Sequence, residues 1–270
     1  MFGIDAGGTY IKFGEPVNDV MEMHPLPYSK DWLRLQFRQA NSPFLVTGAG
    51  SDTIVSWFPE LHFEKVGELD ATGLGGAYLA GVKECIVINI GSGTPLLHVE
   101  VDSKQVTHLG GSGLGSASVA GLSYYMTGIE DLDRIDEKAF AGNPDKVNLL
   151  IEDIYEDPEQ VKLPGDVTAS NFGKYQEWRH LNKGKMPEPK DLLAALHKMI
   201  GETIGVMANL ACKQCKTRGL PVVITGGGTL SRALIKYLDI TFQYLKQPYI
   251  IPSKAVYSTL HGLFVFKDLI

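Results

Sequence analysis

The sequence predicts an α/β protein made of two similar halves. One observation is a strand–glycine turn–strand unit that occurs twice, as IDAGGT over residues 4–9 and as INIGSGT over residues 88–94. Strands and helices follow both copies in a similar order, which is typical of a repeated α/β unit. The second observation is that 270 residues, 44% of them hydrophobic and 21% charged, suffice for a sizeable core. We expect halves 1–80 and 81–270, the second with helical additions.

The first half is predicted to contain strands over 2–5 and 10–13, a helix over 29–40, a strand over 43–47 and a helix over 71–80. The first two strands flank a glycine turn and therefore form a hairpin whose tip exposes backbone N–H groups. Apolar residues spaced among charged ones favour the first helix. The second helix is rich in small residues and is followed by Gly81, a common cap residue.

The second half is predicted to contain strands over 84–90 and 95–101, a helix over 117–127, a long helix over 191–217, a strand over 221–225 and a helix over 230–238. The run ECIVINI (84–90) is apolar throughout, as central strands are. A third glycine turn is expected over 109–116 and a fourth over 226–228, whereas the charged segment 130–170 predicts short helices and loops.

Charge and cysteine content exclude several classes of protein. The net charge of −6 and the scattered Lys and Arg residues disfavour a nucleic-acid partner. No run of about 18 apolar residues indicates a membrane span, and the first residues lack the apolar stretch of a signal peptide. Cys85, Cys212 and Cys215 cannot form a disulfide framework, so we expect a cytoplasmic protein.

Glycine turns are suited to phosphate, because backbone N–H groups without a neighbouring Cβ can approach it closely. A single turn is weak support, and none of the four fits the P-loop or the Rossmann pattern. The joint pattern is more specific. Asp5, Thr9 and Lys12 at one turn face Ser92 and Thr94 at another, which predicts a two-sided phosphate clamp. Asp5 supplies a carboxylate for phosphate-bound Mg²⁺, through water.

At this point the chain resembles the sugar kinase, heat-shock protein and actin superfamily of ATPases. It is more narrowly similar to type II pantothenate kinases, especially the compact bacterial form. The segments that carry the resemblance are GIDAGGTYIK (3–12), the Glu-x-Asp-Ala element (68–71), INIGSGT (88–94), the glycine turn 110–115 and GDVTASNFG (165–173). The resemblance implies two ribonuclease-H-like halves, as in actin-like ATPases, with mixed sheets flanked by helices and ATP in the cleft between them.

The resemblance also implies an activity, the transfer of the ATP γ-phosphoryl group to the primary hydroxyl of pantothenate. The product is 4'-phosphopantothenate, in the first step of coenzyme A biosynthesis. The family works as a homodimer and uses ATP and Mg²⁺. Glu68 matches the general base that such a transfer needs. The alternative reading of Glu68 is an acid in the first turn of a helix, where it favours the helix dipole.

Further residues match the family's binding elements. The nucleotide set is Asp5, Ala6, Gly7, Gly8, Thr9, Tyr10, Ile11, Lys12, Ser92, Ser116, Ala117, Ser118, Val119, Ala120, Leu132 and Gly227. The pantothenate set is Glu68, Ser92, His108 and Gly111, and Asp5 is the magnesium residue. Simpler readings are a strand-end Asp5, a solvated Lys12 and an exposed strand-end His108.

Some positions depart from the family pattern. His108 stands where the family has an arginine, whose charged fork binds phosphate or carboxylate. Ser116 and Ala117 replace glycines, and Leu132 replaces a tyrosine. These departures bear on substrate affinity and on substrate identity.

Three other functions compete with this interpretation. A sugar or amino-sugar kinase shares the DAGGT turn, but the Asn-Asp pair and the cysteine-rich zinc element of such enzymes are not visible. A non-catalytic ATP-binding sensor protein is the second. A dehydratase-activator ATPase would need cluster-ligating cysteines, and the three present are misplaced for that. Cys212 and Cys215 are expected to be structural.

Overall fold

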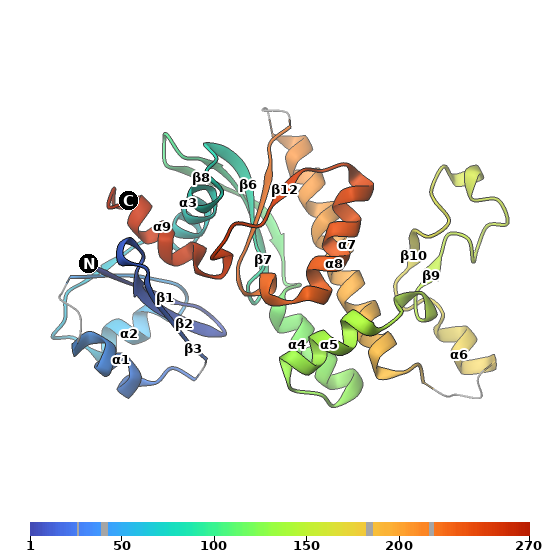
Figure 1. The fold of residues 1–270 in the computed structure, drawn as a ribbon, viewed down its shortest axis with the longest axis horizontal. Helices are drawn as coiled ribbons and strands as arrows, with labels where there is room; N and C mark the ends of the chain where they lie inside the picture. Colours follow the sequence, from blue (N-terminus) through green and yellow to red (C-terminus); the bar gives the residue numbers. More distant parts are fainter. Residues whose placement is uncertain (26, 39–42, 182–185, 216–218) are drawn as a thin grey trace. The chain divides into compact units, whose positions relative to one another are not determined.

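The computed structural model describes residues 1–25, 27–38, 43–181, 186–215 and 219–270. Its first sheet has the strand order β3-β2-β1-β4-β5, and Figure 1 labels the strands β1, β2 and β3. The strands are β1 (Phe2–Ala6), β2 (Tyr10–Glu15), β3 (Val20–Pro25), β4 (Phe44–Thr47) and β5 (Phe63–Lys65). Strands β1, β2 and β3 are antiparallel, and β4 and β5 continue the sheet in parallel with β1.

The second sheet repeats this arrangement with the order β8-β7-β6-β11-β12. The strands are β6 (Glu84–Asn89), β7 (Thr94–Glu100), β8 (Gln105–Ser112), β11 (Val222–Thr225) and β12 (Tyr249–Ile250). Strands β6, β7 and β8 are antiparallel, and β11 and β12 run parallel to β6. The repeat inferred from two short glycine units therefore extends over ten strands, in two mixed sheets.

The repeat extends to the register of the strands. Asp5 at the end of β1 is aligned with Thr47 of the parallel strand β4. Asn89 at the end of β6 is aligned with Thr225 of β11 in the same way. Asp5 and Asn89 hold equivalent places in the two sheets, but only the first of them carries a charge.

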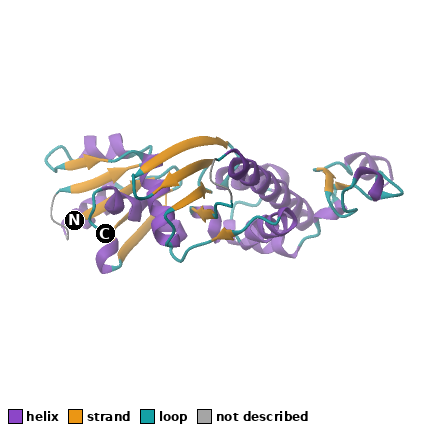
Figure 2. Ribbon diagram, turned by 90° about the horizontal axis from the view of Figure 1, so that it is seen from above, coloured by secondary structure: helices purple, strands orange, loops and turns teal. Residues whose placement is uncertain are grey.

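Helices alternate with the strands along the chain, and Figure 2 draws them in purple. They are α1 (Lys30–Arg38), α2 (Ser51–Trp57), α3 (Glu68–Ala80), α4 (Ser116–Thr127), α5 (Leu132–Ala141), α6 (Tyr175–Leu181), α7 (Pro189–Gln214), α8 (Arg232–Leu245) and α9 (Ser258–Phe266). A short ladder of β9 (Leu149–Leu150) and β10 (Thr168–Ser170) completes the regular structure among the described residues.

Helices α3 and α9 lie against each other, and each packs on a different sheet. Helix α3 contacts β6, β7, β8 and β11, whereas α9 contacts β1, β2 and β4. The helices approach so closely that a Cβ on Gly75 would overlap the Ser258 carbonyl, and one on Gly262 would overlap the Ala71 carbonyl. Glycine is needed at this crossing because the two backbones are in contact.

The hydrophobic core follows the same division. Aromatic residues of the first sheet and of helix α1 form one cluster with ring contacts, among them Phe13, Phe37, Phe44 and Phe63. A second cluster joins α3 to the second sheet through Leu74, Val87 and Leu97. Apolar side chains of α9, Leu260, Leu263 and Phe264, form a third with Leu45.

The chain forms two compact units. The first is Met1–Ala117, Met207–Leu230 and Leu245–Ile270, and it contains both five-stranded sheets. The second is Ser118–Val206 with Ser231–Tyr244. The predicted halves, 1–80 and 81–270, were inferred from the repeated strand unit and do not coincide with these two compact units. The boundary at residue 80 stays a prediction. In the described part of the chain, no helix combines the length and apolar character needed to cross a membrane.

Several predicted elements differ in their bounds. Helix α3 begins at Glu68 rather than at residue 71, because the Ala71 N–H already bonds the Gly67 carbonyl. Helix α8 begins at Arg232 and continues to Leu245, because buried Thr241 and Phe242 extend its apolar face past residue 238. Residues 39–40 and 216–217, which the sequence assigned to helices, lie outside the described residues. The sequence does not predict strands β3, β5, β8, β9, β10 and β12 or helices α2, α6 and α9.

Candidate functional site

The first glycine turn follows a buried ion pair. Asp5 is directly opposite Lys12 in the β1–β2 hairpin, so both side chains lie on one face of the sheet. The Lys12 ammonium donates to the Asp5 carboxylate at 2.8 Å, and their side chains are only 12% and 5% exposed. A buried carboxylate requires such a partner. The simpler reading of Lys12 as a solvated lysine is therefore wrong, and Asp5 is a strand-end residue with a charged partner.

The two predicted turns meet. The hydroxyl oxygens Thr9 Oγ1 and Ser92 Oγ are 3.2 Å apart, one from the β1–β2 turn and one from the β6–β7 turn. A Cβ built on Gly8 would lie 2.9 Å from Ser92 Oγ, so a larger residue would displace the Ser92 hydroxyl. Both hydroxyls are exposed to solvent. The structure thus places two hydroxyl groups and a glycine backbone at one point.

Glu68 is the first residue of α3, with its side chain open to solvent. Its immediate surroundings still desolvate the carboxylate, which raises the pKa of Glu68 above its ordinary value. The Asp5 carboxylate raises that pKa further, and the Lys12 ammonium opposes both effects. Glu68 therefore lies within electrostatic reach of the ion pair at the first turn. A carboxylate with a raised pKa accepts a proton more readily than an ordinary glutamate.

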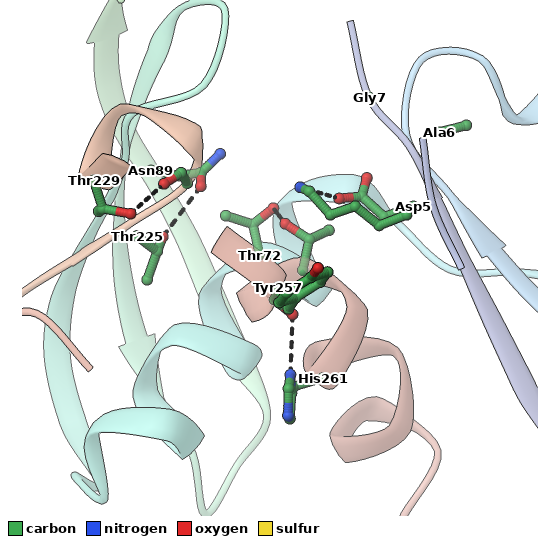
Figure 3. Close-up of polar contacts among 12 residues, drawn as sticks. Asp5, Ala6, Gly7, Thr72, Asn89, Thr225, Thr229, Tyr257 and His261 are labelled. Carbon is green, nitrogen blue, oxygen red and sulfur yellow. Dashed lines mark hydrogen bonds and ion pairs between the residues drawn. The ribbon is translucent and has the colours of Figure 1, made fainter. Parts of the chain in front are cut away.

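Two further glycine turns converge on the β6–β7 turn. The Ser116 N–H donates to the Gly91 carbonyl at 2.8 Å, and the Gly228 N–H donates to the Ile90 carbonyl at 2.7 Å. Gly227 lies beside Gly228, in the turn after β11. At the ends of the strands that lead into two of these turns, the Thr225 hydroxyl donates to the Asn89 side-chain oxygen at 3.1 Å (Figure 3). The turns around residues 91, 115 and 227 therefore form one cluster.

The third turn differs from its prediction. Strand β8 continues through Gly111 to Ser112, because these residues pair with Pro95 and Thr94 of β7. The glycines at 110 and 111 are thus strand residues next to an irregularity in register, and the turn itself covers residues 113–115. His108 is exposed within the strand, opposite Leu97, rather than at a strand end.

Other predicted residues occupy several settings. The side chains of Ala6 and Ile11 are fully buried, so only their backbone can reach a ligand, whereas Tyr10 is partly exposed. Ala117 belongs to the first unit. Ser118, Val119, Ala120 and Leu132 belong to the second unit, where Val119 is buried and Leu132 is exposed at the start of α5. The motif 165–173 is also in that unit, where Thr168 on β10 donates to Glu202 at 2.8 Å.

One contact at the first turn had no signal in the sequence. Tyr28 lies between β3 and α1, and its hydroxyl donates to the carbonyls of Gly7 and Ala6 at 2.7 and 3.1 Å. Neither its spacing nor any motif connects it with residues 6–7. Only the return of the chain after β3 brings it there.

The residues at the first turn fit a phosphate-bound magnesium ion. No cluster of three or more His, Cys, Asp or Glu side chains in the described ranges is arranged for metal binding. Mg²⁺ bound to a nucleotide does not need one, because phosphate oxygens and water fill most of its coordination sites and one or two carboxylates suffice. Asp5 offers one such carboxylate, and because it is already paired with Lys12 at 2.8 Å it would hold the ion through water.

A family model described as Fumble matches residues 45–247. The chain belongs to the Fumble family. This Fumble-family chain is 28% identical over 273 residues to a protein named type II pantothenate kinase from Staphylococcus aureus (strain USA300), an alignment that covers 98% of this chain and 99% of its relative. The resemblance inferred from the motifs is confirmed.

Solved structures show the fold of this Fumble-family chain. The (R)-2-hydroxyglutaryl-CoA dehydratase component A of Acidaminococcus fermentans matches with a TM-score of 0.64 at 15% identity, over 100% of this chain and 98% of that one. The activator of the 2-hydroxyisocaproyl-CoA dehydratase from Clostridium difficile, with bound ADPNP, matches with a TM-score of 0.62 at 13% identity, over 100% and 95%. The predicted fold class, two mixed-sheet halves of the actin-like ATPase type, is confirmed.

Proposed function

We propose that this protein is an ATP-dependent kinase that phosphorylates the primary hydroxyl of pantothenate, giving 4'-phosphopantothenate. The observation that carries the proposal is the meeting of Thr9 and Ser92, 3.2 Å apart, with the Glu68 carboxylate within electrostatic reach of the same turn. The Staphylococcus aureus relative, aligned over nearly its full length, is named for this activity. The bound ADPNP named for one structural neighbour supports ATP as the phosphoryl donor.

The turns bind the phosphates in this proposal. The Thr9 and Ser92 hydroxyls and the Gly8 backbone donate hydrogen bonds to phosphate oxygens, and Lys12 adds a positive charge beside Asp5. Bound Mg²⁺ would neutralise phosphate charge, with Asp5 holding it through water. Ser116 and Gly227 border the nucleotide from the adjoining turns. Because each donor is fixed by a hairpin or by a helix start, the site is organised before substrate arrives.

Glu68 acts on the acceptor. Its carboxylate accepts the proton of the pantothenate hydroxyl as the oxygen of that hydroxyl attacks the γ-phosphorus and the bond from phosphorus to the ADP oxygen breaks. Desolvation and Asp5 raise the pKa of Glu68, which strengthens it as a base. His108 and Gly111 on β8 contribute to pantothenate binding, with the imidazole in the place of the family's arginine. A homodimer is expected from the family resemblance.

The test is an ADP-release assay with Mg-ATP and a panel of acceptors. Pantothenate should produce rapid ADP release, whereas glucose and N-acetylglucosamine should leave only the background rate. Release with a sugar but not with pantothenate would establish the sugar kinase alternative. ATP binding without release for any acceptor would establish a sensor protein. Either result would overturn the proposal.

A further inference from the structure

Tyr28 fixes the backbone of the first glycine turn from the side of helix α1. Its hydroxyl donates to the Gly7 carbonyl at 2.7 Å and reaches the Ala6 carbonyl at 3.1 Å. Burial raises the pKa of the Tyr28 phenol, and the negative charges of Asp5 and Glu68 raise it further. The hydroxyl is therefore protonated near neutral pH and remains a donor.

A second turn holds Tyr28 in this position. The Gly50 N–H donates to the same Ala6 carbonyl at 3.0 Å. A Cβ on Gly50 would overlap the Tyr28 hydroxyl and ring, so the tyrosine fills the space that this glycine leaves free. Gly50 has φ −87° and ψ 0°, a conformation open to other residues. The glycine is thus required by Tyr28 and not by its own backbone.

The bond to Gly7 determines the direction of the next amide. A trans peptide points its N–H opposite to its C=O. The carbonyl of Gly7 is bound by Tyr28, so the Gly8 N–H of the same peptide points away from the tyrosine. The preceding amide is already used, because the Gly7 N–H donates to Tyr10 O at 3.1 Å. Gly8 is also the residue whose Cβ position lies next to Ser92.

We infer that Tyr28 is a positioning residue for phosphate binding, whose hydroxyl fixes the Gly7–Gly8 peptide so that the Gly8 N–H is presented to a nucleotide phosphate. The inference rests on the proposed binding of ATP at this turn. It adds a side chain outside the glycine motif, contributed by the loop between β3 and α1. Tyr28 touches neither reacting atom, so its effect should fall on nucleotide affinity rather than on the chemical step.

Tyr28→Phe tests this role with little disturbance, because only the hydroxyl is lost. A fluorescent ATP analogue is titrated into the protein in the presence of Mg²⁺. Its Kd should rise roughly threefold to tenfold, the range expected from the loss of one hydrogen bond of ordinary net strength. The KM for ATP should rise equally, while kcat and the KM for pantothenate stay near the wild-type values. Gly50→Ala should act in the same direction by displacing the ring. Tyr244→Phe, at an exposed tyrosine on α8, is the matched control and should change nothing.

Hydrogen exchange of the unliganded protein separates this role from the proposed function. Peptides that contain residues 6–9 should exchange faster in Tyr28→Phe and in Gly50→Ala than in the wild type. Unchanged nucleotide Kd in Tyr28→Phe, with wild-type binding intact, would overturn the role of Tyr28 alone. A wild-type protein that binds no nucleotide would overturn the proposed function and the role of Tyr28 in phosphate binding, whereas faster exchange in both variants would still show that Tyr28 restrains the turn.

Discussion

Thr9 Oγ1 and Ser92 Oγ lie 3.2 Å apart, although 83 residues separate them in the sequence. Each follows the first strand of one of two sheets with the same strand order, so the contact joins equivalent turns of a repeated structure. Two hydroxyls that face each other in this way can bind oxygens of the same phosphate chain from two sides.

This pairing predicts that the two hydroxyls act together on ATP. Thr9→Val and Ser92→Ala should each weaken ATP binding by about 1–2 kcal/mol, because each removes a hydrogen bond to a charged group. The double variant should lose less than the sum, by about 0.5–1 kcal/mol, since the groups are in contact. Titration calorimetry of the four proteins measures the coupling. Additive losses would mean that the two turns bind nothing in common.

His108→Arg is expected to preserve or raise the rate with pantothenate. The side chain at this position is exposed on β8, so an arginine fits without repacking, and its fixed fork binds an anion more strongly than one imidazole donor. Steady-state kinetics with pantothenate as the varied substrate provide the measurement. A loss of activity would show that the site is built around the imidazole.

The raised pKa of Glu68 predicts opposite effects of pH on rate and on stability. As a base, Glu68 works only when ionised, so kcat/KM should fall with decreasing pH, at a pH above the ordinary glutamate value of 4.5. For stability, the folded state binds the Glu68 proton more tightly than the unfolded state. The contribution of Glu68 to the free energy of unfolding is therefore present at low pH. It is lost as the pH rises through the pKa of Glu68 in the folded state.

Glu68→Gln should consequently be more stable than the wild type at neutral pH, and this difference should vanish in acid. Urea unfolding at several pH values measures it, since the glutamine cannot ionise. A stability difference that grows as the pH falls would contradict the raised pKa.

The α3–α9 crossing predicts a strong effect of a single methyl group. Gly262→Ala would make its Cβ overlap the Ala71 carbonyl, so one of the two helices must move. We expect the unfolding free energy to fall by about 2 kcal/mol or more, in the upper part of the range for overpacking. Gly121→Ala is the control, because nothing lies within 4 Å of its Cβ position on α4. Thermal denaturation should leave that control at or slightly above wild-type stability. Equal stability of both variants would mean that the helices are not in contact.

Local chemistry made part of the site predictable. The glycine turn predicts the hairpin in which Asp5 and Lys12 lie opposite each other, although their ion pair was not predicted. The meeting of the turns at Thr9 and Ser92 follows from the repeat, because equivalent strands carry equivalent turns. Both are consequences of strand order and register, which glycine turns and apolar runs indicate.

Other features depend on contacts that the sequence does not encode locally. Tyr28 reaches Gly7 only because the chain returns after β3. The glycines at 110 and 111 resemble a turn in composition, but pairing with β7 makes them strand residues. The sequence predicts Glu68 just before its helix, but α3 begins at Glu68, and Gly67 provides no side-chain cap that would mark this start.

Mass spectrometry of the reaction products tests the central claim most directly. Wild-type protein with Mg-ATP and pantothenate should yield ADP and phosphorylated pantothenate. Glu68→Gln should lower this rate by on the order of a hundredfold or more, the contribution expected of a general base, while it still binds ATP. Phosphopantothenate formed equally fast by Glu68→Gln, or no phosphopantothenate from the wild type, would contradict the account.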